Sequence, residues 1–465
     1  MKPLKITINP KKHTTILSFI IPATIRAIPE IQFPYPIGFD TPLYFAFAKY
    51  HAQKGLWPPY RLFQTIILGG LYTIGIDPIT AMKILPTIIY GLFGLSTYLL
   101  AKNYLQWNNT KSLLTTIITT LSIANLRTSW DMHDLMLGLV LLTLTISTIK
   151  KPHNTITLLI LTTLTILAHQ LTAVILLSIL LTLTLTNTKN KQYLIIFATL
   201  IITFTLFTYL NIDYISKLYW IPTFTYPSLQ SITNESQNII MIIKLYLPIL
   251  PLSIIGYFKD KIITTWLILT LLGSLSTIIS PSFILGGISV QPWRYILLLA
   301  TPLTIYTTNT IWKIKTKINK TQTITILAII LLLHTTTLTF LGLKITPPYY
   351  ETPGTIPNNM IQTSIPLYDI QPTITLLNQI KNEQNITLLV YGDFVGWASY
   401  YTNAKIIGFS GTYNEAPDLR QALTNITTKN NLYLLWWNDQ EAYSLGFKKI
   451  SHQGNLTLYK YNNTT

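Results

Sequence analysis

The sequence contains no cysteine among its 465 residues. Disulfide bridges, a thiolate nucleophile and a metal site built on sulfur are therefore excluded within this chain. Charged residues are also scarce, at 11%, where a soluble domain has about 25%. Acidic residues are the rarer kind, with 16 Asp and Glu against 33 Lys and Arg. An acid that stands beside an apolar segment is therefore a candidate for function.

Apolar residues are correspondingly abundant. The chain is 49% hydrophobic, and its mean hydropathy is +0.40. A net charge of +17 can indicate nucleic-acid binding, but the lysines stand in short groups between apolar runs, which is typical of cytoplasmic loops. We therefore predict an integral α-helical protein of the cell (plasma) membrane with no nucleic-acid partner.

The N-terminal segment fixes the first crossing. Lysines precede an apolar run over residues 14–28, and no small-residue cleavage site follows it. This pattern predicts a retained first span with the N-terminus in the cytoplasm.

One ambiguous segment, Leu62–Ile76, decides the topology. It is apolar but carries three glycines. If it crossed the membrane, most of the lysine-rich loops would face outward, against the positive-inside rule. We therefore predict a surface or re-entrant helix here. His169 and Gln170 would be costly in hydrocarbon, so they divide the run 155–186 into two spans. About 11 spans result: 14–28, 79–101, 113–126, 135–149, 155–167, 171–186, 193–210, 239–258, 262–279, 293–311 and 323–343.

This topology divides the chain into two domains. Residues 1–344 form the membrane domain, in which 29–78 is an outer loop with juxtamembrane helices. Residues 345–465 lie outside the cytoplasm and form an α/β domain. Its predicted strands are 387–391, 405–409, 432–437 and 456–461, with helices at 374–382, 416–424 and 440–445 between them.

The predicted topology places polar residues from four separate loops at the outer membrane face. Asp40 is the central one, because Pro36, Gly38 and Pro42 around it restrict the backbone. Solvated loop charges are the simpler alternative for each residue alone: Arg127 could extend to water from a helix end, and His169 could be an ordinary loop residue. The whole set is Arg26, Glu30, Asp40, Arg127, Asp131, His133, Asp134, His169 and Arg294.

Part of this set has the chemistry of a metal site. Asp40, Asp131, His133 and Asp134 offer carboxylate oxygens and one imidazole, which suit Mg²⁺ or Mn²⁺. Such an ion would orient a phosphate leaving group and neutralise its charge. The guanidinium of Arg294 could bind phosphate through two hydrogen bonds.

Three motifs carry a resemblance to a known family. Pro36-Ile-Gly-Phe-Asp40-Thr-Pro-Leu-Tyr44 follows the first span, Ser129-Trp-Asp131-Met-His-Asp134 supplies a second acidic loop, and Trp293-Arg294-Tyr opens a late span. Over about residues 14–310 this layout resembles the GT-C superfamily of membrane glycosyltransferases. The superfamily uses polyprenyl-phosphate-linked sugars and includes protein mannosyltransferases, lipid A aminoarabinose transferases and oligosaccharyltransferases. The subfamily stays open, because Asp40 is followed by Thr41 and not by the second acid of the mannosyltransferases.

The resemblance implies a function and roles for residues. The chain would transfer a sugar from a polyprenyl-phosphate donor in the membrane to a lipid, glycan or protein acceptor, with inversion at the anomeric carbon. Asp40 would be the catalytic acid of the first loop, with Glu30 as a second catalytic candidate. Arg26, Tyr44, His169 and Arg294 would bind substrate.

Two other classes of function stay open at this point. A lipid or solute transporter would also hold charges in its membrane domain, but often with inverted repeats, and the sequence shows no internal repeat. A non-catalytic membrane scaffold with a binding outer domain is the other alternative. An Asp40→Asn substitution separates them, because it stops a transferase and leaves a scaffold unaffected.

Overall fold

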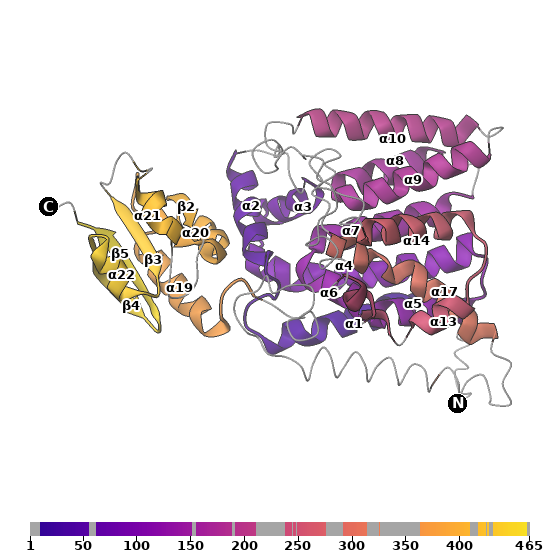
Figure 1. Cartoon of the computed structure of the whole chain (residues 1–465), viewed down its shortest axis with the longest axis horizontal. Coiled ribbons are helices and arrows are strands. Elements are labelled where there is room, and N and C mark those ends of the chain that lie inside the picture. Colours follow the sequence, from indigo (N-terminus) through magenta and orange to yellow (C-terminus); the bar gives the residue numbers. More distant parts are fainter. Residues whose placement is uncertain are drawn as a thin grey trace, which may run out of the picture.

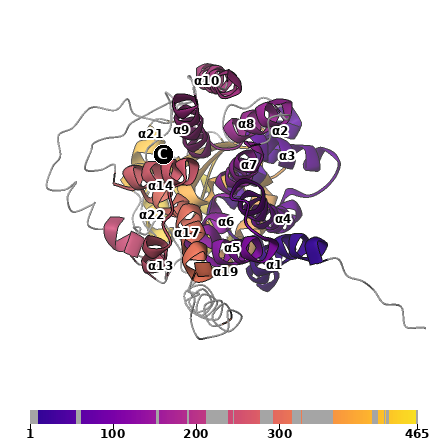
Figure 2. The same cartoon turned by 90° about the vertical axis from the view of Figure 1, so that its right-hand side faces the viewer.

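The structure, a computed structural model, describes residues 10–54, 62–150, 155–187, 191–210, 238–243, 245–247, 249–275, 292–313, 325, 363–409, 417–424, 426 and 431–462. They form a bundle of helices with a smaller sheet-containing domain at one end (Figure 1). Figure 2 views the bundle from its other end, with the sheet behind the helices.

The bundle consists of short and long helices. Several begin with a capping side chain: Asp77 accepts a hydrogen bond from the backbone N–H of Thr80, and Asn108 accepts one from Lys111. The described helices are α1 (Pro10–Gln32), α2 (Thr41–Lys54), α3 (Leu62–Thr73), α4 (Pro78–Leu99), the π-helical turn η1 (Leu100–Tyr104), α5 (Asn109–Leu121), α6 (Ile123–Asp131), α7 (His133–Thr148), α8 (Thr155–Ala168), α9 (Gln170–Thr186), α10 (Lys191–Leu210), α13 (Leu250–Ile255), α14 (Lys261–Ser274), α16 (Pro292–Leu298) and α17 (Ala300–Lys313).

Helices α1 and α4 pack closely along their length. A Cβ atom on Gly94 would lie 2.4 Å from the carbonyl oxygen of Ser18, so only glycine permits this approach. Among the described residues, these two helices contain the segments long and apolar enough to cross a membrane, His13–Ile31 and Pro78–Tyr104.

The predicted count of about 11 spans is not reproduced. Several of the predicted spans are apolar helices of 10–17 residues, whereas a crossing needs about 20. Of the predicted span 323–343 the structure describes residue 325 alone, and the domain boundary at 344–345 lies outside the described residues. The predicted break at His169 is confirmed, because this residue is extended and separates α8 from α9.

The basic loops gather at one end of the bundle. Lys111 donates a hydrogen bond of 3.0 Å to Asn309, and Lys150 donates one of 2.9 Å to the carbonyl oxygen of Tyr104. The hydroxyl of Tyr104 in turn donates to Asp260 at the start of α14. The positive-inside rule predicts that this end faces the cytoplasm.

Labelling of single cysteines tests this orientation, and the chain has no native cysteine to interfere. A cysteine at Lys261, exposed at the basic end, is expected to react with an impermeant maleimide only after the membrane is opened. A cysteine at Lys448, exposed on the sheet domain, is expected to react in intact cells. Labelling of the Lys261 site from outside would reverse the predicted orientation.

The C-terminal domain has one five-stranded sheet in the order β2-β1-β3-β5-β4. Strands β2, β1 and β3 are parallel, and β5 and β4 are added antiparallel. The elements are α19 (Leu367–Gln379), β1 (Thr387–Tyr391), the 3₁₀ turn η4 (Gly392–Phe394), α20 (Val395–Tyr401), β2 (Lys405–Phe409), α21 (Pro417–Thr424), β3 (Leu432–Trp436), α22 (Asp439–Ser444), β4 (Phe447–Gln453) and β5 (Leu456–Tyr461).

The four predicted strands of this domain are confirmed, with β3 one residue shorter. Strand β4 and helix α20 were not predicted. Strand β4 is an edge strand whose residues are mostly exposed and polar, so it lacks the apolar run by which the others were found. Helix α20 has only 7 residues, too few for a helical period to be recognised.

The sheet domain and the outer loop of the bundle share one hydrophobic core. Tyr44 and Phe45 of α2 lie in the same buried cluster as Leu388 and Trp397 of the sheet domain. The rings of Phe45 and Trp397 are 5.6 Å apart. Because burial of apolar surface stabilises this contact, α2 and the domain form one continuous structure.

Candidate active site

A buried ion pair stands where α1 meets the outer loop. Arg26 and Glu30 lie four residues apart on α1, and their side chains pair at 2.8 Å. The Nε of Arg26 donates to the carbonyl oxygen of Ser129 in α6, and Glu30 accepts the backbone N–H of Ile37. Arg26 is completely buried and Glu30 is 3% exposed. Their surroundings favour a role in positioning the loop over direct contact with a substrate.

The loop that follows crosses over α6 and α7 at very short range. Gly38 has a φ of +115°, and a Cβ there would lie 2.4 Å from both the hydroxyl of Thr41 and the carbonyl oxygen of Trp130. Thr41 closes the turn by donating to the carbonyl oxygen of Ile37 at 2.7 Å. Any side chain at position 38 would push the loop away from the helices.

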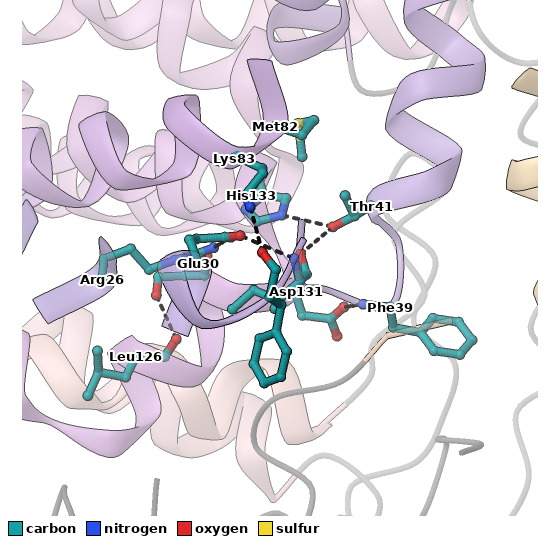
Figure 3. Close-up of polar contacts among 12 residues, drawn as sticks. Arg26, Glu30, Phe39, Thr41, Met82, Lys83, Leu126, Asp131 and His133 are labelled. Carbon is teal, nitrogen blue, oxygen red and sulfur yellow. Dashed lines mark hydrogen bonds and ion pairs between the residues drawn. The ribbon is translucent and has the colours of Figure 1, made fainter. Parts of the chain in front are cut away.

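Asp131 at the end of α6 holds the loop by its backbone (Figure 3). One carboxylate oxygen accepts the N–H groups of Phe39 and Asp40 at 2.7 and 3.3 Å. The other pairs with Arg127 at 3.0 Å. Burial opposes ionisation of this carboxyl group, but Arg127 and the two amides outweigh it, so the pKa of Asp131 lies below its ordinary value.

The second acidic loop also reaches α2 through side chains. Tyr44 donates its hydroxyl to Asp134 at 2.9 Å, and its ring lies 5.4 Å from that of His133. The Nε2 of His133 is 3.4 Å from the hydroxyl of Thr41. The structure therefore brings Tyr44, His133 and Asp134 together, beside the loop that Asp131 holds.

Asp40 occupies the turn that starts α2. Its carbonyl oxygen accepts the N–H groups of Leu43 and Tyr44 at 3.0 and 3.3 Å, so the residue stands at the N-terminal end of the helix. It is half-exposed, whereas Asp131, His133 and Asp134 behind it are buried. The fixed backbone and half-exposed side chain suit a carboxylate that meets a ligand from outside the protein.

Two predicted substrate-binding residues lie elsewhere. His169 caps α9 by accepting the N–H of Leu171 at 3.1 Å. It packs against Gly138, five residues and about 8 Å along α7 from His133. Arg294 is half-buried in α16, a helix that packs against α6.

The four predicted metal ligands do not form a ligand set. Within the described residues, no group of three or more His, Asp and Glu side chains is arranged to hold an ion. Asp131 is committed to Arg127 and two backbone amides, and Asp134 accepts from Tyr44 and from its own neighbour Leu135. The arrangement does not fit Mg²⁺ or Mn²⁺, so we derive no step through a metal.

Comparison with known proteins adds one finding to this geometry. No protein-family model and no curated protein sequence matches the chain. The fold resembles that of AftD, an arabinofuranosyltransferase from mycobacteria. The two structures superpose with a TM-score of 0.56 at 10% sequence identity, over 96% of this chain and 40% of that one. At this identity the likeness shows the fold alone, and it agrees with the predicted helical fold.

Sequence reasoning missed the part that Arg127 plays. It stands four residues before Asp131, as Arg26 does before Glu30. Side chains at this spacing are neighbours on a helix surface, so both pairs could have been read from the sequence. Arg127 was instead interpreted as a cation that extends to water, and its side chain is 9% exposed.

Replacement of Asp131 tests whether it holds the loop. Asp131→Asn leaves Arg127 buried without its charged partner, so we expect a loss of about 3–5 kcal/mol in the free energy of unfolding. Arg127→Met with Asp131→Asn removes both charges and is expected to recover part of this loss. Because the folded pKa of Asp131 is lowered, its contribution is present above the ordinary Asp pKa and lost as the pH falls below about 4. Thermal unfolding at pH 7 and at about pH 2–3 measures both effects, and equal stability of Asp131→Asn and wild type at pH 7 would contradict them.

Proposed function

We propose that this chain is a membrane glycosyltransferase that moves a sugar from a polyprenyl-phosphate donor to an acceptor hydroxyl at the α2 end of the bundle. The observation that carries the proposal is the placement of Asp40, half-exposed on a turn whose backbone is held by buried Asp131. The likeness of the fold to that of an arabinofuranosyltransferase supports it. The sugar and the acceptor stay open.

The proposed reaction is a single displacement. Asp40 takes the proton of the acceptor hydroxyl, the acceptor oxygen forms a bond to the anomeric carbon, and the bond from that carbon to the donor phosphate breaks. The polyprenyl phosphate leaves with the electron pair. The attack comes from the face opposite the phosphate, so the configuration inverts through an oxocarbenium-like transition state.

Other residues of the set take supporting roles in this proposal. Arg294 in α16 would stabilise the phosphate as negative charge develops on it. Tyr44 and Asp134 fix the first turn of α2 against α7. Arg26 and Glu30 position the loop from behind, so Glu30 acts through the backbone of Ile37 and does not touch the substrate. The donor's lipid tail would lie in the membrane beside the bundle.

The same geometry predicts that the reaction does not depend on a metal ion. Because the predicted ligands are engaged with protein partners, we expect turnover to persist in excess chelator. Donor consumption is compared before and after treatment with EDTA. A loss of activity that Mg²⁺ or Mn²⁺ restores would reinstate the metal site predicted from the sequence.

A donor panel tests the proposed function. The purified chain in lipid nanodiscs is incubated with radiolabelled polyprenyl-phosphate pentoses and hexoses, with and without a membrane extract that supplies acceptors. We expect at least one donor to be consumed by the wild type and not by Asp40→Asn. Binding of a donor without consumption in either protein would favour the non-catalytic scaffold, and movement of intact donor across the bilayer would favour the transporter.

A further inference from the structure

The sheet domain has a topological switch point. The order β2-β1-β3 places β2 and β3 on opposite sides of β1, and all three strands are parallel. Helix α20 lies on one face of the sheet, in the core shared with α2, and α21 lies on the other. In parallel sheets, ligands bind outside the carboxyl ends of the strands at the point where the order reverses. Here that point lies between β1 and β3.

A row of aromatic residues lies along the carboxyl ends of the three parallel strands. Tyr391 ends β1, and its ring lies 6.2 Å from that of Phe409 at the end of β2. On the other side it lies 5.7 Å from Trp437, just after β3. Tyr391 and Trp437 are half-buried, so neither residue is fully enclosed by the domain. Flat apolar ring faces of this kind pack against the C–H faces of sugar rings.

A carboxyl group follows this row directly. Asp393 lies two residues after Tyr391, in the turn that leads into α20. Burial raises the pKa of Asp393 to about 7, and in the described part of the chain no hydrogen bond or ion pair to this side chain is recorded. A carboxylate in this position can accept hydrogen bonds from a ligand that carries hydroxyl groups.

The same turn faces the outer loop of the bundle. Pro42 at the start of α2 touches Gly396 at the start of α20. Farther along α2, Lys49 donates at 3.0 Å to the carbonyl oxygen of Thr402, just past the end of α20. The two helices therefore run side by side in the same direction, and their N-terminal ends lie together.

This arrangement fixes the positions of two carboxyl groups. Asp40 lies two residues before Pro42, and Asp393 lies three residues before Gly396. Each therefore lies at the N-terminal end of its helix, next to the place where the two helices touch. Asp393 and the candidate catalytic Asp40 stand at the same end of the helix pair, one from each domain.

We propose that Asp393, Tyr391 and Trp437 form a binding subsite for a carbohydrate, which the sheet domain presents to Asp40. The aromatic rings hold the faces of one or two sugar residues, and Asp393 accepts hydrogen bonds from their hydroxyl groups. The inference rests on the proposed function in one respect: the bound carbohydrate is the acceptor of the transferred sugar. Binding itself requires no catalysis.

Binding of soluble oligosaccharides tests the subsite. Oligomers of arabinose, mannose, galactose and N-acetylglucosamine are offered at millimolar concentration to the full chain in nanodiscs, and binding is measured by saturation-transfer NMR. We expect at least one series to bind, and Asp393→Asn and Tyr391→Ala to weaken its binding by about 10-fold or more. The matched control is Glu383→Gln, a carboxylate before β1 at the opposite edge of the sheet, which is expected to bind as the wild type does.

The outcomes separate this inference from the proposed function. Oligosaccharide binding that depends on Asp393, without sugar transfer from any donor, supports the subsite and defeats the transferase. Transfer by the wild type with the same KM for acceptor in Asp393→Asn overturns the subsite and leaves the transferase in place. Absence of binding by all four series, or equal binding by Asp393→Asn in a protein with unchanged thermal unfolding, also overturns it.

Discussion

Asp40→Asn is expected to reduce turnover by about 100-fold or more, the usual contribution of a general base. The amide keeps the shape of the side chain but cannot take the proton of the acceptor hydroxyl. The fold should be unchanged, because Asp131 holds the loop through the backbone N–H of residue 40, which the substitution retains. Initial rates of donor consumption and thermal unfolding of the purified variants measure the two effects.

Glu30→Gln is the matched control for that experiment. Glu30 is 3% exposed and paired with Arg26, so its neutral replacement leaves a buried charge uncompensated. We expect this variant to lose stability, with a smaller effect on turnover in the fraction that stays folded. If Asp40→Asn keeps the wild-type rate with a verified donor, Asp40 is not the catalytic acid and its turn serves the fold only.

Gly396→Val is expected to separate the sheet domain from the outer loop. A Cβ at this position would lie 2.6 Å from the carbonyl carbon of Pro42 and 2.7 Å from the backbone nitrogen of Leu43. Backbone atoms cannot move aside as a flexible side chain does, so α20 must shift away from α2. A displacement of about 1 Å at a reacting group can lower a rate by about 100-fold, and we expect a loss of this order.

Gly70→Ala in α3 provides the control for the glycine substitution. An added Cβ at Gly70 has no neighbouring atom within 4 Å, so this variant should keep the wild-type rate and thermal unfolding. Turnover, thermal unfolding and oligosaccharide binding are measured on all three proteins. Normal turnover of Gly396→Val would mean that contact between the domains is not needed for the reaction.

The sequence predicted the members of the site better than their roles. Four loops that are distant in the sequence are predicted to lie at one surface. Residues of two of them do lie together: Asp40 and Tyr44 with Asp131, His133 and Asp134. This prediction rests on the distribution of lysines among the loops, which indicates the side of the membrane on which each loop lies. That topology cannot show which carboxylates pair within the protein, and Asp131 was therefore taken for a metal ligand.

The contact between the sheet domain and the outer loop could not be predicted from the sequence. Contact between α2 and α20 depends on Gly396, a residue with no side chain to mark it. Asp393 stands in a short polar turn like many others, and only the strand order places it at a switch point. Strand order is a long-range property, whereas strands themselves were found from local apolar runs.

Donor consumption by the wild type and Asp40→Asn, purified in parallel and followed over one time course, tests the central claim most directly. We predict that the wild type releases polyprenyl phosphate from at least one sugar donor and that Asp40→Asn releases it at least about 100-fold more slowly. Equal rates in the two proteins, or no release by the wild type from any donor that it binds, would contradict the claim that this chain transfers sugar at Asp40.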